Sequence, residues 1–127
     1  MPDAEEPDQL RAATYARARQ RLSSTSDLPP MPWQAAGVPP DDVTLIRNVL
    51  WRANRGADAD TVRAELESAL QLMDSARAEL DALETGLLFV ARAEGLTWGE
   101  VARHRGLKSP QAAQQRQDRL STRTALP

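Results

Sequence analysis

Amide and guanidinium side chains near the C-terminus are the residues of this sequence best suited to a specific chemistry. Glutamine amides match the edge of adenine, and arginine guanidinium groups match guanine or phosphate in the major groove of DNA. We expect the glutamines to meet base edges and the cations to read guanine or to set the register on the phosphates. The candidate DNA-contacting residues are Arg103, Arg105, Lys108, Ser109, Gln111, Gln114, Gln115, Arg116, Arg119 and Arg123.

Catalytic chemistry finds little support in the same sequence. The chain has a single histidine, His104, and no cysteine. Its acidic pairs are adjacent or two residues apart, and carboxylates at these spacings do not converge on one helix face. The sequence also lacks a phosphate-cradling glycine loop and a metal-ligand cluster. We therefore expect neither an enzyme nor a bound cofactor or metal, and no small-molecule substrate.

Two short helices joined by a glycine turn must position the candidate residues. Thr97 and Glu100 are spaced as a capping box at the start of the first helix. Gly106 can take the positive φ that ends this helix, Leu107 can fold back onto it, and Ser109 can cap a second helix. Proline at the first position of that helix, followed by turns rich in glutamine and arginine, predicts a helix over about 110–122.

The second helix has few side chains to bury, since its apolar residues are Ala112, Ala113 and Leu120. Small alanines allow close packing on the first helix, which leaves the amides and guanidinium groups outside. This composition favours a recognition helix. The alternative is a solvated C-terminal helix with no ligand, and the paired alanines leave the phase of the helix open by one residue.

The stretch from Gly95 to Leu120 resembles the helix-turn-helix of bacterial sigma-factor region 4. It is more similar still to small actinobacterial DNA-binding proteins with a glycine-leucine-threonine-tryptophan start and a "Q-A-A-x-Q-R-x-x-R-L" second helix. The resemblance covers about 26 of the 127 residues and implies major-groove binding. Two positions differ from the pattern: Arg105 replaces an apolar residue before the turn, and Lys108 lengthens the turn by one residue.

Charge is distributed unevenly along the chain. Residues 92–127 carry a net charge of +4, whereas the preceding 91 residues carry −6, so the overall −2 conceals a basic C-terminal segment. Binding to phosphates depends on local cations more than on the overall charge. A surplus of this size predicts salt-sensitive DNA binding that gains affinity when two copies act together.

The composition predicts an all-α chain with a thin core of leucine, valine and alanine, since aromatic residues are few. The absence of cysteine and of a long apolar segment predicts a cytoplasmic protein without a membrane partner. The DNA-binding interpretation adds an expected location at the nucleoid.

Residues 1–40 are expected to form an N-terminal arm, with a helix at about 8–22 and a proline-rich linker at 23–40. The arm helix is rich in arginine, which is compatible with a second DNA contact, although docking through Tyr15 and Leu22 is the favoured interpretation. We expect Trp33, within the linker, to anchor onto a neighbouring helix.

Residues 41–85 are expected to form a helical hairpin, and residues 86–127 the helix-turn-helix module. Asp41 caps a helix that ends near Gly56. Apolar residues then alternate three and four positions apart across 58–90, the spacing of a coiled coil: Val62, Leu66, Ala69, Met73, Ala76, Leu80, Leu83, Leu87 and Val90.

The long stripe spans about 42 Å, whereas the preceding helix of 13 residues covers only about 20 Å. The remainder must be buried by the arm helix, by the helix-turn-helix or by a second chain. A homodimer through the 58–90 helix is the favoured interpretation, with an intramolecular bundle as the alternative. Gly86 is a position at which the run can break.

The sequence as a whole predicts a DNA-binding protein that acts as a transcriptional regulator or as a nucleoid-associated protein. The main alternative is a helical interaction module whose partner is a sigma factor or a polymerase subunit. A weaker alternative is an antitoxin-like role, in which the proline-rich arm covers a partner.

Overall fold

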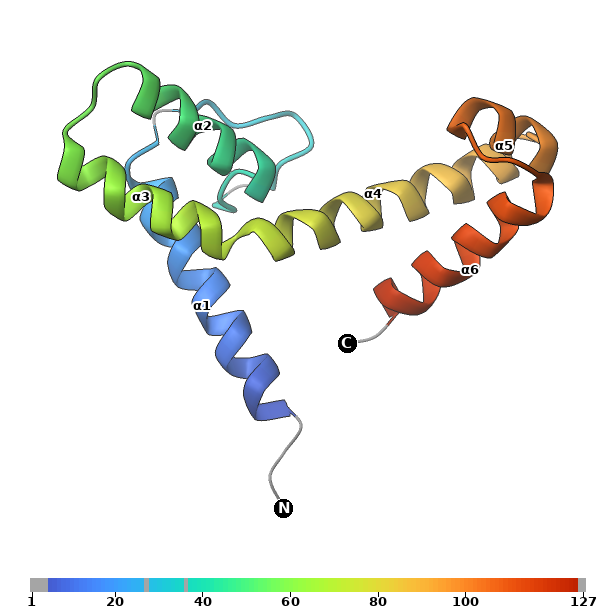
Figure 1. Cartoon of the computed structure of the whole chain (residues 1–127), viewed down its shortest axis with the longest axis horizontal. Helices are drawn as coiled ribbons and strands as arrows, with labels where there is room; N and C mark the ends of the chain where they lie inside the picture. The colour runs from blue at the N-terminus through green and yellow to red at the C-terminus, as the bar shows by residue number, and fades with distance from the viewer. Residues whose placement is uncertain (1–4, 27, 36, 126–127) are drawn as a thin grey trace. The chain divides into compact units, whose positions relative to one another are not determined.

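The structure is a computed structural model that describes residues 5–26, 28–35 and 37–125. Over these residues the chain forms six helices and no strand, which confirms the predicted all-α class (Figure 1). The helices are α1 (Glu5–Ser24), α2 (Asp42–Asn54), α3 (Ala59–Gln71), α4 (Met73–Ala93), α5 (Trp98–Arg105) and α6 (Pro110–Ala125). None of the helices in these ranges is both long and apolar enough to cross a lipid bilayer.

The chain divides into two compact units, Met1–Ala76 and Arg77–Pro127. The division falls within α4, whereas the sequence suggested boundaries after residues 40 and 85. Each unit has its own cluster of buried apolar side chains.

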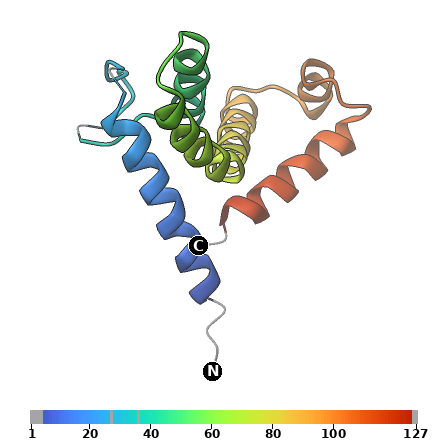
Figure 2. The ribbon, with the colours of Figure 1, turned by 60° about the vertical axis from the view of Figure 1, so that its left-hand side comes forward.

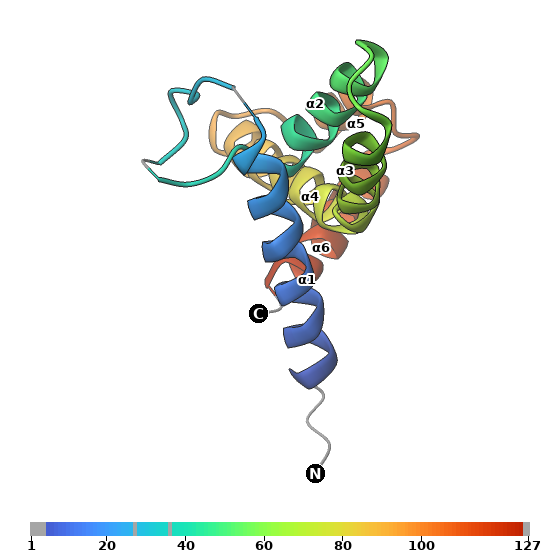
Figure 3. The same cartoon turned by 90° about the vertical axis from the view of Figure 1, so that its left-hand side faces the viewer.

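The first unit is built from α1, α2 and α3, which pack against one another (Figure 3). Its core consists of Ala18, Leu22, Leu45, Val49, Ala69 and Leu72, with Tyr15 and Ile46 packed against it. The arm helix is therefore docked through Tyr15 and Leu22, as favoured from the sequence. The first half of α1 extends beyond α2 and α3, and Leu10 there is exposed (Figure 2).

Local capping fixes where the helices of this unit begin. The Asp41 carboxylate accepts a hydrogen bond from the Thr44 N–H at 3.3 Å, which confirms Asp41 as the predicted N-cap of α2. Asp58 caps α3 in the same way through the Thr61 N–H at 3.2 Å. Between these helices Gly56 has a φ of 77°, a conformation that favours glycine.

Two buried carboxylates tie the helices of the first unit together. Asp42 accepts hydrogen bonds from Arg19 at 2.7 Å and from Ser75 at 2.6 Å. Glu65 accepts one from Arg52 at 2.6 Å, and Arg52 also donates to the backbone carbonyl of Thr25 at 3.1 Å. Polar groups thus supply much of the cross-linking in a unit whose apolar core is small.

A single helix over 58–90 was expected, and this expectation was wrong at one position. The helix is interrupted at Leu72, whose N–H is shared between the carbonyls of Ser68 at 3.2 Å and Ala69 at 3.1 Å. Leu72 is fully buried in the core, so the tightened turn accompanies its insertion there. Gly86, in contrast, lies within α4 and does not break it.

Trp33 does not anchor the linker. Its side chain is 80% exposed, so the expectation that it docks onto a helix was wrong. The linker is instead held by short-range hydrogen bonds, such as the one from the Gln34 side chain to the Val38 carbonyl at 2.7 Å.

Candidate nucleic-acid interface

The second unit places the predicted DNA-contacting residues on α5, on α6 and on the turn between them. Its core joins α4, α5 and α6 through Leu88, Val101, Ala102, Ala113 and Leu120. From the turn, α6 runs back toward the middle of α4 (Figure 1). The small residues Ala102 and Ala113 allow α5 and α6 to pack closely, as the sequence indicated.

The predicted start and end of α5 and the predicted start of α6 are confirmed, and α6 continues to Ala125, three residues beyond the predicted 122. Thr97 and Glu100 form a capping box, with 3.1 Å for each of its two hydrogen bonds. Gly106 has a φ of 75° and ends α5, and the Leu107 N–H donates to the Ala102 carbonyl at 2.8 Å. The Ser109 hydroxyl accepts from the Ala112 N–H at 3.1 Å and so caps α6. This hydroxyl is therefore occupied by the cap.

The structure resolves the phase of α6 that the sequence left open. Ala113 and Leu120 are buried, and Ala112 is only half-buried. Each residue advances about 100° around a helix, so Gln111 and Gln115 lie on the side of α6 opposite Ala113. Gln114 lies at the edge of that outer side. All three glutamines are exposed.

Two arginines expected to contact DNA are instead bound to one carboxylate of α4. Arg116 and Arg105 each donate two hydrogen bonds to Glu84, with Arg116 Nη2 at 2.8 Å and Arg105 Nη2 at 3.2 Å from Oε1. Glu84 is mostly buried, so these pairs hold α5 and α6 to α4. Both guanidinium groups therefore have a carboxylate partner within the unit, and the Arg105 side chain remains 45% exposed beside it.

The double pairing also fixes the charge of this carboxylate. The hydrogen bonds from Arg116 lower the pKa of Glu84 from its ordinary 4.5 to about 2, against the opposing effect of burial, and Arg105 adds to the lowering. The same bonds raise the pKa of Arg116. Glu84 therefore stays ionised and bound throughout the physiological pH range.

Two further cations of this unit have partners within it. Arg123 Nη1 lies 3.1 Å from an Asp81 carboxylate oxygen, although its side chain remains largely exposed. Arg92 donates to the Leu96 carbonyl at 2.7 Å and stacks over the Trp98 ring, with 4.6 Å from its guanidinium carbon to the ring centroid. Trp98 is consequently a packing residue, as expected.

Six of the ten predicted residues remain exposed and, within the described chain, without an ion pair or side-chain hydrogen bond: Arg103, Lys108, Gln111, Gln114, Gln115 and Arg119. They combine three cations with three amides on α5, the turn and α6. We call this set the α6 surface. Sites with this mixture can bind phosphate and base edges together.

The partners Asp81 and Glu84 were missed from the sequence. They are three residues apart, so they lie on one face of α4, and both are only partly exposed. The signal available was an acidic pair at helical spacing, upstream of a segment rich in arginine. Nothing local specifies which cations it meets, because Glu84 and Arg116 are 32 residues apart.

Replacing Glu84 with glutamine is expected to lower the free energy of unfolding of the second unit by about 2 kcal/mol at pH 7, because two charge-assisted contacts are lost. A carboxylate whose pKa is lowered by folding stabilises the folded state at pH values above its pKa in the unfolded chain. The difference between wild type and Glu84→Gln should therefore shrink as pH falls from about 4.5 to about 2. Urea unfolding at several pH values, followed by Trp98 fluorescence, measures this difference in unfolding free energy. A difference independent of pH would contradict the assignment.

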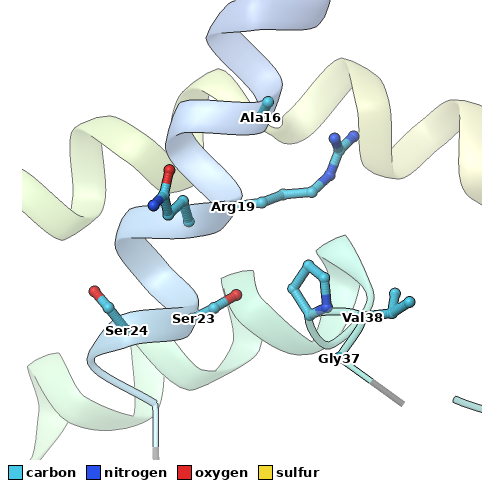
Figure 4. Close-up of a pocket in the computed structure, with 8 residues that line it drawn as sticks. Ala16, Arg19, Ser23, Ser24, Gly37 and Val38 are labelled. Carbon is cyan, nitrogen blue, oxygen red and sulfur yellow. The ribbon is translucent and has the colours of Figure 1, made fainter. Parts of the chain in front are cut away.

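A pocket of about 690 Å³ lies in the first unit, between α1 and the segment before α2 (Figure 4). Its charged lining residue, Arg19, is already bound to Asp42 and Ser75. Ser24 donates to the Arg21 carbonyl at 2.8 Å. This lining offers no nucleophile with an adjacent base. Among the described residues no cluster of three histidine, aspartate or glutamate side chains is placed to hold a metal ion.

No protein-family model, curated protein or solved structure matches this chain.

Proposed function

We propose that the chain binds double-stranded DNA through a helix-turn-helix formed by α5 and α6, with α6 in the major groove. The observation that carries the proposal is the α6 surface, on which Gln111 and Gln115 point away from the core between the free cations Lys108 and Arg119. A short first helix, a glycine turn and a second helix exposed along its outer face form the arrangement in which recognition helices are presented.

In the proposed complex, the cations contact phosphates and the glutamines contact base edges. Arg103 and Lys108 flank the turn and would set the register on the backbone, while Arg119 reaches phosphate or guanine. Arg116 and Arg105 contribute indirectly, because their ion pairs with Glu84 hold α5 and α6 in position on α4. The function that follows is transcriptional control or nucleoid organisation, with the protein located on the chromosome.

Salt-dependent binding to a random-sequence duplex tests the proposal. The wild-type affinity should fall steeply with salt, since each phosphate contact contributes about 0.9 to the slope of log K against log salt. The triple variant Arg103→Ala, Lys108→Ala, Arg119→Ala should reduce this slope by nearly 3 and bind much more weakly. Fluorescence anisotropy of a labelled duplex, at salt concentrations from about 50 to about 200 mM, measures the affinity and its slope.

A control with the same loss of charge comes from the first unit. The variant Arg11→Ala, Arg17→Ala, Arg63→Ala also removes three exposed cations. Because these residues lie outside the α6 surface, it should bind DNA nearly as the wild type does. An equal loss in both variants would contradict the proposal and favour a contact through α1 or through overall charge. Failure of the wild type to bind any duplex at low salt would favour the protein-interaction alternative.

A further inference from the structure

The heptad stripe is partly covered over its first half and uncovered over its second. Ala69 is buried in the core of the first unit and Ala76 is also buried, whereas Leu66 is 37% exposed. From residue 80 onward the stripe is exposed, and its residues follow one another at spacings of three, four and three. These residues and their neighbours form what we call the α4 face: Leu80, Leu83, Gly86, Leu87, Phe89 and Val90.

The α4 face is strongly apolar. Its five large side chains are between 56 and 71% exposed. Contiguous apolar patches on the order of several hundred Å² are uncommon on monomers and mark interaction sites. The spacing of the leucines is that of helix-to-helix packing, so the matching occupant is another helix.

The helices of the second unit do not cover this face. Leu88 is buried against α5 and α6, whereas Gly86, two residues away, is exposed. Two residues correspond to about 200° of rotation, so Gly86, in the middle of the α4 face, lies opposite the core of the unit, and Leu80 and Leu87 lie about 80° and 100° from Leu88. An occupant of this face therefore leaves the α6 surface free.

Gly86 gives an independent indication of a close approach. Glycine inside a helix costs about 1 kcal/mol relative to alanine. Within the described chain, Gly86 has no positive φ and a Cβ added there would meet nothing within 4 Å, so neither a turn nor internal packing requires glycine. A residue without a side chain in the middle of an exposed apolar face permits the backbone of a second helix to approach closely.

We propose that the α4 face pairs with the same face of a second copy of this chain. The six residues are all uncharged, so two copies of them meet without an unpaired buried charge, and the acidic residues on the same side of the helix, Glu79 and Glu94, lie at the two ends of the face. A face with a ridge of leucines beside a glycine suits two-fold pairing, the commonest form of self-association. The pairing stands without the proposed function; combined with it, two α6 surfaces are presented to one duplex.

Sedimentation of the full chain tests the pairing. Wild type should sediment at twice the chain mass at about 100 micromolar, a concentration that detects dimers of micromolar Kd. The Gly86→Leu side chain would occupy the space between the two helices, so this variant should sediment as a monomer. Because leucine favours the helix more than glycine does, the variant should be at least as helical as wild type by circular dichroism. A monomeric wild type, or a Gly86→Leu variant that stays dimeric, would overturn the proposal. Absence of DNA binding would not change either mass.

Cross-linking provides a second test, with a side chain much smaller than leucine at the same position. The chain has no cysteine, so a single introduced thiol can cross-link only to another copy. A disulfide requires Cα atoms within about 7 Å. Gly86→Cys should therefore form a covalent dimer under mild oxidation, whereas Thr122→Cys, exposed on α6, should not. Equal cross-linking at both positions would indicate random collision and overturn the proposal.

Discussion

Replacing Leu120 with alanine is expected to lower the free energy of unfolding of the second unit by about 3 kcal/mol and so to weaken the proposed DNA binding. Leu120 is 1% exposed and is one of five buried residues in the core of this unit. Removing a buried leucine side chain costs its transfer free energy and leaves a cavity. A core this small has little stability to lose. Urea unfolding followed by Trp98 fluorescence measures the change.

The reporter and the control for this prediction come from the same chain. Trp98 is the sole tryptophan of residues 77–127, and the exposed Trp33 and Trp51 can be replaced by phenylalanine to isolate its signal. Leu70→Ala removes a leucine that is 72% exposed, and should change stability by less than about 0.5 kcal/mol. If Leu120→Ala behaved like Leu70→Ala, the packing of α6 described above would be incorrect.

The second large effect is expected in the first unit, on replacing Arg52 with alanine. Glu65 is 2% exposed and its charge is balanced by Arg52 at 2.6 Å. Removing one partner of a buried pair leaves an uncompensated charge, at a cost of about 3 kcal/mol or more. Thermal unfolding followed by circular dichroism should show a clear decrease in stability at pH 7.

Two further variants separate the buried charge from other consequences of the change. Arg63→Ala breaks an exposed pair with Glu67 at 3.8 Å, and should cost less than about 1 kcal/mol. Arg52→Ala combined with Glu65→Leu removes both charges and should recover most of the lost stability. A double variant as unstable as Arg52→Ala alone would show that the hydrogen bond to Thr25, rather than the buried charge, is the important contact.

The α4 face and the α6 surface lie on different sides of the same unit and differ in polarity. The first is apolar and the second is polar. The two proposals assign a second copy to the first and a DNA duplex to the second. Glu84 connects α4 to both helices of the proposed DNA-binding module through Arg105 and Arg116. If both proposals hold, changes at the α4 face should alter the proposed DNA binding through the number of copies, and changes at Glu84 should alter it through the presentation of α6.

Much of the local structure was predictable because its causes lie within a few residues. Asp41 begins α2, Thr97 and Glu100 begin α5, and Gly106 ends it, and in each case the hydrogen bonds join residues at most four apart. Capping depends on the side chain and backbone of one turn, so residue type and spacing are sufficient to predict it. The outward composition of α6 followed in the same way from its scarcity of apolar residues.

The tertiary structure decided which charges are free and which apolar residues are covered. The sequence does not distinguish Arg116 from Arg119, yet Arg116 meets Glu84 and Arg119 stays in solvent. Nor does the heptad pattern distinguish Ala76, which is buried, from Leu83, which is exposed. Sequence spacing therefore determined the helices and their ends, because those interactions are local. Burial and ion pairing depend on contacts between residues far apart in the chain, which only the packing of the helices fixes.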